Sequence, residues 1–90
     1  MYLVSNKPKV DEIFQKLAKK NPKQLEIITK KLQQILEDPY RFKPLSNVLK
    51  GFRRVHIDKS FVLIYSIDEN TKTVILEDYD HHDRFTDNDS

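Results

Sequence analysis

The order of hydrophobic patterns along this chain limits its fold more than any other feature. Two stretches in the first half place apolar residues three and four positions apart, which is the repeat of an amphipathic helix. Three segments in the second half are short, rich in Val, Ile, Phe and Tyr, and separated by brief polar turns, as strands are. Two helices followed by neighbouring strands predict a small domain in which the helices cover a sheet.

Prolines mark where the two helices begin and end. The first helix is expected to begin at Lys9, directly after Pro8. Asn21-Pro22 is typical of an N-cap followed by a first-turn proline, so a second helix should start there. This helix should stop at Asp38-Pro39, because a proline disfavours helical geometry in the residue before it. The connection between the helices is so short that they should pack antiparallel.

The surface beneath these helices should be a sheet of four short strands. The turns at residues 58–60 and 68–72 are short enough to make consecutive antiparallel hairpins. The segment 61–67 is apolar on both faces, so it should lie in the interior of the sheet. The strands are expected at residues 2–4, 52–57, 61–67 and 73–79.

These elements together predict an α+β fold in the order β-α-α-β-β-β, a helix hairpin packed on a small antiparallel sheet. Residues 40–50 would form the crossover from the second helix to the sheet, and residues 86–90 a frayed tail. No repeat or internal linker interrupts the pattern, so residues 1–90 should form one domain.

Composition excludes several classes of protein. Charged residues make up 33% of the chain and hydrophobic residues 38%, a balance typical of a globular domain. The absence of cysteine rules out disulfides and thiolate metal sites. No apolar run approaches the roughly 18 residues of a membrane helix, and the N-terminus lacks a signal-peptide pattern. We therefore expect a cytoplasmic protein that does not associate with a membrane.

The two parts of the chain differ in charge. Residues 1–60 carry 14 Lys or Arg against 6 Asp or Glu, whereas residues 61–90 carry 2 against 8. Such a separation indicates a basic face for a polyanion beside an acidic segment. A solvated, lysine-rich helix hairpin would give the same counts, and the charge alone favours that simpler interpretation.

The strand at residues 52–57 carries the most informative side chains. Alternation places Arg54 and His56 on an open face and leaves Val55 and Ile57 for the core. Arg53 is the weaker candidate for contact with a phosphate, because it falls on the core side of the same strand. An arginine and a titratable imidazole thus share one face, two residues apart.

Further groups with suitable chemistry lie before and after this strand. Lys43 and Lys50 approach from the preceding loop, and His81 follows the last strand. RNA cleavage without a metal needs a base for the ribose 2′-OH, an acid for the leaving oxygen and a cation for the phosphorane. The side chains that supply these chemical types are His56, His81, Lys43 and Arg54.

Two other interpretations of these residues remain open. Phe61, across a tight hairpin from His56, is equally suited to stacking on a base and to filling the core. The acidic and histidine-rich segment at the end of the chain has the ligand types of a divalent-metal site, but its spacing matches no specific signature. We therefore expect neither a metal nor a cofactor. The members of that segment are Asp78, Asp80, His81, His82 and Asp83.

The motifs in this half resemble those of the RelE/ParE toxin superfamily, most closely its YafQ-like branch. In that branch a strand of the form G-[FY]-R-x-x-H leads to an aromatic residue and L-[IV]-Y, and the chain closes with H-x-x-x-F. The likeness covers nearly the whole chain, whereas its specific motifs occupy about half. The matching segments are Lys43-Pro44-Leu45, Lys50-Gly51-Phe52-Arg53-Arg54-Val55-His56, Phe61-Val62-Leu63-Ile64-Tyr65 and His81-x-x-x-Phe85.

The resemblance implies a toxin of a type II toxin–antitoxin pair. Many members enter the ribosomal A site and cut mRNA by attack of the 2′-OH without a metal, which inhibits translation. By position, His56 and His81 match catalytic histidines, Phe85 the aromatic residue after the second of them, and Phe61 an aromatic residue beside the substrate base. The resemblance also implies an antitoxin that wraps the helix hairpin and covers the basic groove, in a toxin–antitoxin hetero-oligomer.

Two positions depart from the pattern of the branch. Lys43 replaces a histidine, and Ser60 replaces an aspartate that could act as a base or orient a histidine. A lysine can still stabilise a phosphorane, whereas the loss of the aspartate puts the rate in doubt unless His82 and Asp83 compensate. Two alternatives follow, a ParE-like inhibitor of DNA gyrase and an inactive relic that only binds an antitoxin. The paired histidines favour the nuclease, because ParE-like chains generally lack them.

Overall fold

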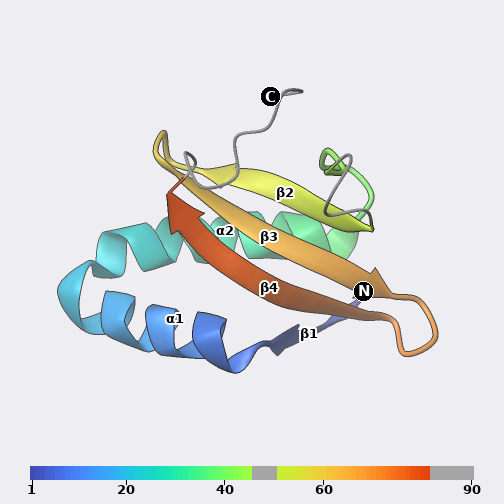
Figure 1. Cartoon of the computed structure of the whole chain (residues 1–90), viewed down its shortest axis with the longest axis horizontal. Helices are drawn as coiled ribbons and strands as arrows, with labels where there is room; N and C mark the ends of the chain where they lie inside the picture. Colours follow the sequence, from blue (N-terminus) through green and yellow to red (C-terminus); the bar gives the residue numbers. More distant parts are fainter. Residues whose placement is uncertain (46–50, 82–90) are drawn as a thin grey trace.

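The computed structural model describes residues 1–45 and 51–81 of the chain. The predicted order of two helices and four strands is confirmed (Figure 1). The second strand has the predicted bounds, while the first lies slightly later in the chain and the last two extend further. The elements are β1 (Leu3–Asn6), α1 (Pro8–Lys20), α2 (Pro22–Glu37), β2 (Phe52–Ile57), β3 (Phe61–Asp68) and β4 (Thr73–His81).

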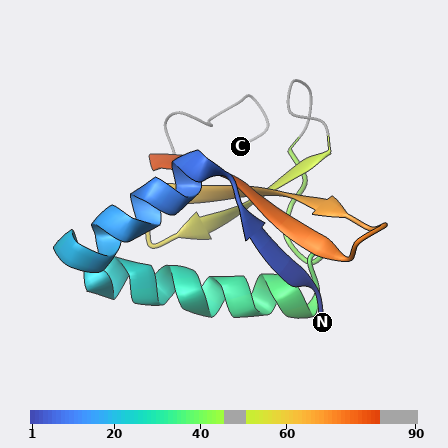
Figure 2. The same ribbon diagram turned by 90° about the horizontal axis from the view of Figure 1, so that it is seen from below.

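Asn21 closes one helix and opens the next, which fixes the hairpin. Its backbone N–H donates to the carbonyl of Leu17 at 2.8 Å and so ends α1. Its side-chain oxygen accepts a hydrogen bond from the backbone N–H of Gln24 at 3.2 Å and so caps α2. Because one residue serves both ends, the chain reverses without a loop and the two helices lie side by side, as the sequence predicts (Figure 2).

The sheet has the strand order β1-β4-β3-β2 and is mixed, which corrects the expectation of an antiparallel sheet. The β2–β3 and β3–β4 pairs are antiparallel as predicted, because tight hairpins join them. In contrast, β1 pairs parallel to β4, with Leu3 beside Thr73. Both helices and two strands separate these two strands in the chain, so no hairpin dictates their direction. The interior position predicted for β3 is confirmed.

Both helices cover the same face of the sheet and bury the main core against it (Figures 1 and 2). A smaller apolar cluster lies on the opposite face of the sheet. We call these the helix face and the open face. The main core contains Val10, Ile28, Ile35, Val55, Ile57, Leu63, Tyr65, Val74, Leu76 and Tyr79, and the smaller cluster contains Leu45, Val62 and Ile64.

A β-bulge interrupts the pairing of β3 with β4. Ile64 pairs with Asp78 and Tyr65 with Leu76, so Glu77 has no partner of its own. The extra residue moves the alternation of β4 by one position, and Tyr79 joins the core in place of Asp78. Every residue of β4 after the bulge, His81 included, therefore lies on the face opposite to the one that continuous alternation would give.

None of the helices within the described residues is both long enough and apolar enough to span a membrane.

Candidate functional site

The segment that carries Lys43 runs antiparallel along the outer edge of β2. The backbone N–H of Leu45 donates to the carbonyl of Phe52 at 2.8 Å, and that of Arg54 donates to the carbonyl of Lys43 at 3.0 Å. Pro44 forms the bridge with Arg53 between these two bonds. This pairing places Lys43 directly beside Arg54, although eleven positions separate the two residues in the sequence.

The same register assigns three of the predicted site residues to one face of the sheet. Residues that face each other across a ladder project to the same side, and alternate residues of a strand share a side. Because Leu45 belongs to the apolar cluster of the open face, Lys43 belongs to that face too. Arg54 and His56 project to the same face from β2, so the open face brings together a lysine, an arginine and a histidine.

Arg54 is the most buried charged residue of this group. It is only 8% exposed, whereas Lys43 and His56 are both exposed. Its partner in the ladder is Ile64, a member of the apolar cluster. None of the ion pairs between described residues includes Arg54. A guanidinium held in partly apolar surroundings gains more from an anion than one in water does, because the local dielectric constant is lower.

Arg53 projects to the helix face, where its guanidinium holds the segment before Lys43. It donates to the carbonyl of Phe42 at 2.7 Å and to that of Tyr40 at 3.4 Å, and it lies 5.1 Å from the centre of the Tyr40 ring. The sequence suggests Arg53 as a second phosphate ligand, but in the structure its donors serve backbone carbonyls. Arg53 thus ties residues 40–45 to β2, and Arg54 is the arginine of the open face.

Tyr65 fixes the start of the same segment from within the core. Its hydroxyl donates to the carbonyl of Pro39 at 2.6 Å, and its side chain is fully buried. Burial raises the pKa of Tyr65 to about 12, because the phenolate would lose its hydration. The hydroxyl therefore remains a hydrogen-bond donor at neutral pH.

The rings of His81 and Phe61 contact each other on the helix face, at the end of the sheet near the β2–β3 hairpin. The two residues are direct partners in the β3–β4 ladder, with ring centroids 4.5 Å apart and planes inclined by 30°. Phe61 also stacks on Tyr79, with centroids 5.3 Å apart and planes inclined by 4°. The structure therefore engages Phe61 with two rings of its own chain.

The two histidines predicted to act together lie on opposite faces of the sheet. His56, Val62 and Asp80 form one row across β2, β3 and β4 on the open face. The next row contains Phe61 and His81, on the helix face. The rows are consecutive, so both imidazoles border the same end of the sheet, but they project in opposite directions. The remaining predicted residues, Lys50 and Phe85, lie outside the described residues.

Three residues of the alternative metal site, Asp78, Asp80 and His81, belong to β4. In residues 1–45 and 51–81, no group of three or more His, Cys, Asp or Glu side chains is close enough to hold a metal ion. Asp78 forms an ion pair with Lys9 at 3.0 Å. His82 and Asp83, which belong to the same interpretation, fall outside the described part of the chain.

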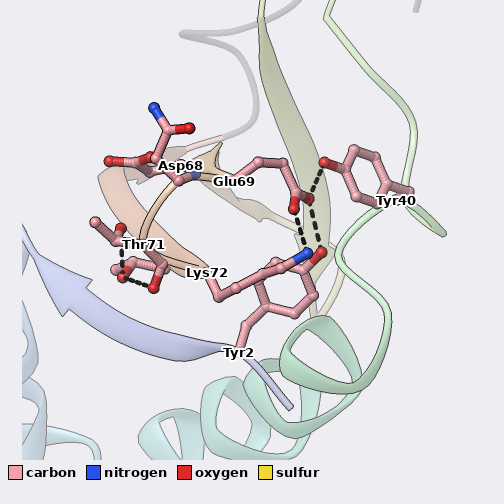
Figure 3. Close-up of polar contacts among 8 residues, drawn as sticks. Tyr2, Tyr40, Asp68, Glu69, Thr71 and Lys72 are labelled. Atoms are coloured by element: carbon pink, nitrogen blue, oxygen red, sulfur yellow. Dashed lines mark hydrogen bonds and ion pairs between the residues drawn. The ribbon is translucent and has the colours of Figure 1, made fainter.

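A polar cluster at the other end of the sheet escaped the sequence analysis. Glu69 accepts hydrogen bonds from the hydroxyl of Tyr2 at 2.7 Å, from the ammonium of Lys72 at 2.7 Å and from the hydroxyl of Tyr40 (Figure 3). We call these four residues the Glu69 clasp. It joins the N-terminus, the connection after α2 and the β3–β4 hairpin. Because its members come from three distant segments, no local spacing signals it.

Hydrogen bonding shifts the pKa values within the Glu69 clasp in opposite directions. The bonds from Lys72, Tyr40 and Tyr2 lower the pKa of Glu69 to about 2, because all three donors favour the carboxylate. The pKa of Tyr40 rises to about 12, chiefly because its hydroxyl donates to Glu69. The cluster therefore holds one charged acceptor and neutral tyrosine donors across the physiological range of pH.

The chain is similar to toxins of type II toxin–antitoxin systems. The model of the family described as the ParE toxin of the type II toxin–antitoxin system parDE matches residues 7–84. A Methanocaldococcus jannaschii protein assigned as toxin RelE4 is 51% identical over 83 residues, which cover 92% of this chain and 88% of the relative. An uncharacterized Methanosarcina mazei protein is 55% identical over 84 residues, which cover 93% of this chain and 98% of the relative.

Solved structures of toxins share the fold. The YoeB/ParE toxin from Agrobacterium tumefaciens superposes with a TM-score of 0.81 at 11% identity, covering 89% of this chain and 98% of that one. In the RelBE2 toxin–antitoxin complex from Mycobacterium tuberculosis, the matched chain superposes with a TM-score of 0.74 at 25% identity, covering 90% and 98%. In the intact E. coli RelBE complex, the matched chain superposes with a TM-score of 0.76 at 18% identity, covering 88% of this chain and 94% of that one. The YafQ-like branch stays a prediction.

Proposed function

This chain belongs to the RelE/ParE superfamily of type II toxins, and we propose that it is an endoribonuclease that cleaves mRNA on the ribosome. The observation that carries the proposal is the grouping of Lys43, Arg54 and His56 on the open face of the sheet. Two cations and one titratable imidazole there match the needs of phosphodiester cleavage. Inhibition of translation would follow from the loss of intact message.

The proposed reaction uses the ribose of the message as its own nucleophile. The 2′-oxygen forms a bond to the adjacent phosphorus while the bond from phosphorus to the 5′-oxygen breaks. A base removes the proton of the 2′-hydroxyl, an acid returns a proton to the 5′-oxygen, and the products are a 2′,3′-cyclic phosphate and a 5′-hydroxyl. Charge builds on the phosphoryl oxygens in between, where Arg54 and Lys43 would stabilise it.

His56 and His81 are the proposed proton-transfer groups, one acting as the base and the other as the acid. His56 lies on the same face as the two cations. His81 borders the same end of the sheet from the helix face, so a substrate strand would have to cross that end to reach both imidazoles. The balance of protons in the reaction requires two such groups, and no metal or cofactor takes part in this scheme.

We further propose that the partner of this chain is an antitoxin that binds as part of a toxin–antitoxin hetero-oligomer. Solved structures with the same fold include toxin–antitoxin complexes. The helix hairpin exposes lysines on which acidic residues of such a partner could dock. The exposed lysines of the hairpin are Lys9, Lys16, Lys19, Lys20, Lys23 and Lys30.

The test incubates the purified protein with programmed ribosomes and mRNA, with EDTA-treated free RNA as a second substrate. Cleavage on the ribosome alone, at sites mapped by primer extension, is the expected result. Arg54→Gln should lower the rate strongly, whereas Lys30→Gln, which removes an exposed lysine of α2, should lower it little. His81→Ala should abolish cleavage and leave the fold intact. Cleavage unchanged by both Arg54→Gln and His81→Ala would refute the proposed site.

Inhibition of DNA gyrase is the second candidate, because the family model that matches the chain is that of the ParE toxin. A gyrase inhibitor would act by binding, and fold alone does not distinguish the two functions. Supercoiling of relaxed plasmid by gyrase, measured with and without the protein, separates them. Inhibition of supercoiling without RNA cleavage would select the ParE-like function, and neither activity in a folded protein would select an inactive relic.

A further inference from the structure

We infer that Phe61 is a positioning residue that orients the imidazole of His81. Part of this inference rests on the proposed function, since it concerns a proposed proton-transfer group, but the contact itself can be measured without any substrate. An exposed histidine at the last residue of a strand has little around it to select one rotamer. In this chain the imidazole lies against the ring of Phe61, with centroids 4.5 Å apart.

Backbone pairing is the first reason why this contact is specific. Phe61 is the first residue of β3 and His81 the last residue of β4, and the two are direct partners in the ladder. Direct partners in an antiparallel pair bring their side chains close together on one face, so the two rings meet without reaching across a neighbour. The register of the sheet thus sets the distance between them.

The second reason is that Phe61 itself is anchored to the core. Its ring stacks on that of Tyr79, which is only 4% exposed. The Tyr79 ring in turn makes a T-shaped contact with Phe14 of α1, with centroids 6.0 Å apart and planes inclined by 75°. The three rings of Tyr79, Phe61 and His81 therefore form a series from the buried core to the exposed surface. A ring held in this way can transmit the order of the core to an exposed imidazole.

These contacts favour one role for Phe61 over another. The resemblance to the toxin family suggests that Phe61 stacks on a base of the substrate. In the structure the ring is half-buried, packs against the main core and contacts two rings of its own chain. Phe61 therefore acts through His81, and its loss should change the rate of the chemical step more than the binding of RNA.

Proton NMR of the free protein tests the contact directly. Imidazole protons beside an aromatic ring experience its ring current, so Phe61→Leu should move the His81 resonances, while Phe61→Tyr should leave them near their wild-type positions. His56 is the internal control, because it projects to the opposite face of the sheet. His81 resonances that stay in place in folded Phe61→Leu would overturn the inference, whatever the protein cleaves.

Cleavage kinetics then test the consequence for the reaction. Phe61→Leu should lower kcat, by up to about 100-fold for a misplaced catalytic group, with little change in KM. Phe61→Tyr, which keeps the aromatic ring, should have a kcat close to that of the wild type.

The outcomes distinguish this inference from its alternatives. A raised KM with unchanged kcat would identify Phe61 as a stacking platform for RNA and overturn the positioning role. If Phe61→Leu does not fold, Phe61→Trp and Phe61→Tyr in the same two measurements decide the question. A wild-type protein that cleaves no RNA refutes the proposed function, and the NMR comparison still decides whether Phe61 orients His81.

Discussion

At the end of the sheet that holds the β3–β4 hairpin, Glu69 accepts hydrogen bonds from side chains of three segments. Toward the opposite end, pairing of the backbone instead gathers Lys43, Arg54 and His56. The Glu69 clasp holds parts of the chain together (Figure 3). In the group of Lys43, Arg54 and His56, Arg54 takes part in none of the ion pairs between described residues. The contrast teaches that stability and proposed chemistry belong to different ends, so substitutions should separate them.

The segment 40–45 connects the two ends. Tyr40 donates to Glu69 at its beginning, and Lys43 pairs with Arg54 further along. Between them Arg53 donates to the carbonyls of Tyr40 and Phe42. Loss of the Arg53 bonds that hold this segment to β2 should therefore affect both stability and cleavage, whereas loss of the Tyr40 hydroxyl alone should affect only stability.

The largest difference between an effect on cleavage and an effect on stability is expected for the pair His56→Gln and Tyr40→Phe. His56→Gln should lower ribosome-dependent cleavage by about 100- to 10,000-fold, the usual contribution of an acid or base, and leave the melting temperature unchanged. Tyr40→Phe removes the bond to Glu69 but keeps the ring beneath Arg53, so it should lower the melting temperature and preserve cleavage. Loss of cleavage in Tyr40→Phe equal to that in His56→Gln would break the distinction between the two ends.

Arg53→Gln should weaken both properties at once. Loss of the charged donors to two carbonyls should lower the free energy of unfolding by about 1–3 kcal/mol, measured in urea. Cleavage should also fall, because the segment that carries Lys43 is no longer tied to β2 by the bonds of Arg53. The backbone amide hydrogen of Arg54 should exchange with solvent faster, since this amide donates to the carbonyl of Lys43. Arg41→Gln is the matched control, because Arg41 is exposed and lies 5.8 Å from the centre of the Phe42 ring. Equal effects of the two substitutions would contradict the role assigned to Arg53.

Replacement of two buried tyrosines by phenylalanine should change the free energy of unfolding in opposite directions. Tyr65→Phe removes the donor to Pro39 and should cost about 1–2 kcal/mol of stability. Tyr79→Phe should instead be neutral or stabilise the protein by up to about 1 kcal/mol. Within the described part of the chain, the buried hydroxyl of Tyr79 has no hydrogen-bond partner. Urea unfolding of both variants provides the measurement, and a loss at Tyr79 as large as that at Tyr65 would show that its hydroxyl is satisfied.

The smallest effect is expected from the titration of Glu69. Its pKa in the folded chain, about 2, lies below the ordinary value of 4.5, so the carboxylate favours the folded state. This stabilisation is present above the ordinary pKa and is lost as pH falls from about 5 to about 2. The melting temperature of Glu69→Gln should therefore depend less on pH in that window than that of the wild type. Because the group is exposed, high salt should shrink the difference, and parallel pH profiles would contradict the assignment.

Much of the fold follows from local patterns in the sequence. Asn21 and Pro22 mark the helix boundary because an N-cap and a first-turn proline act on adjacent residues. The bounds of β2 follow from alternation between a polar turn and the only glycine, Gly51, whose φ of 93° suits a residue without a side chain. The parallel pairing of β1 with β4 could not be predicted in this way. All four residues of β1 are exposed, so no buried face signals where the strand belongs.

The candidate site was predictable only in part, for the same physical reason. Alternation alone assigned Arg54 and His56 to the open face, and Arg53 to the other. The donors of Arg53, the ring contacts of Phe61 and the Glu69 clasp all depend on partners that are distant in the sequence. Spacing along the chain carries no information about such contacts.

The position of His81 shows the difference between what the sequence predicts and what only the tertiary structure fixes. The sequence by itself determined the helix hairpin, the three antiparallel strands and the side-chain alternation of β2, because each depends on neighbouring residues. Only the tertiary structure decided the register, in which the bulge at Glu77 buries Tyr79 in place of Asp78 and carries His81 to the helix face. A carboxylate is costly to bury and a tyrosine ring is not, so packing against the helices selects the register that keeps Asp78 out of the main core, where it is half-buried and pairs with Lys9.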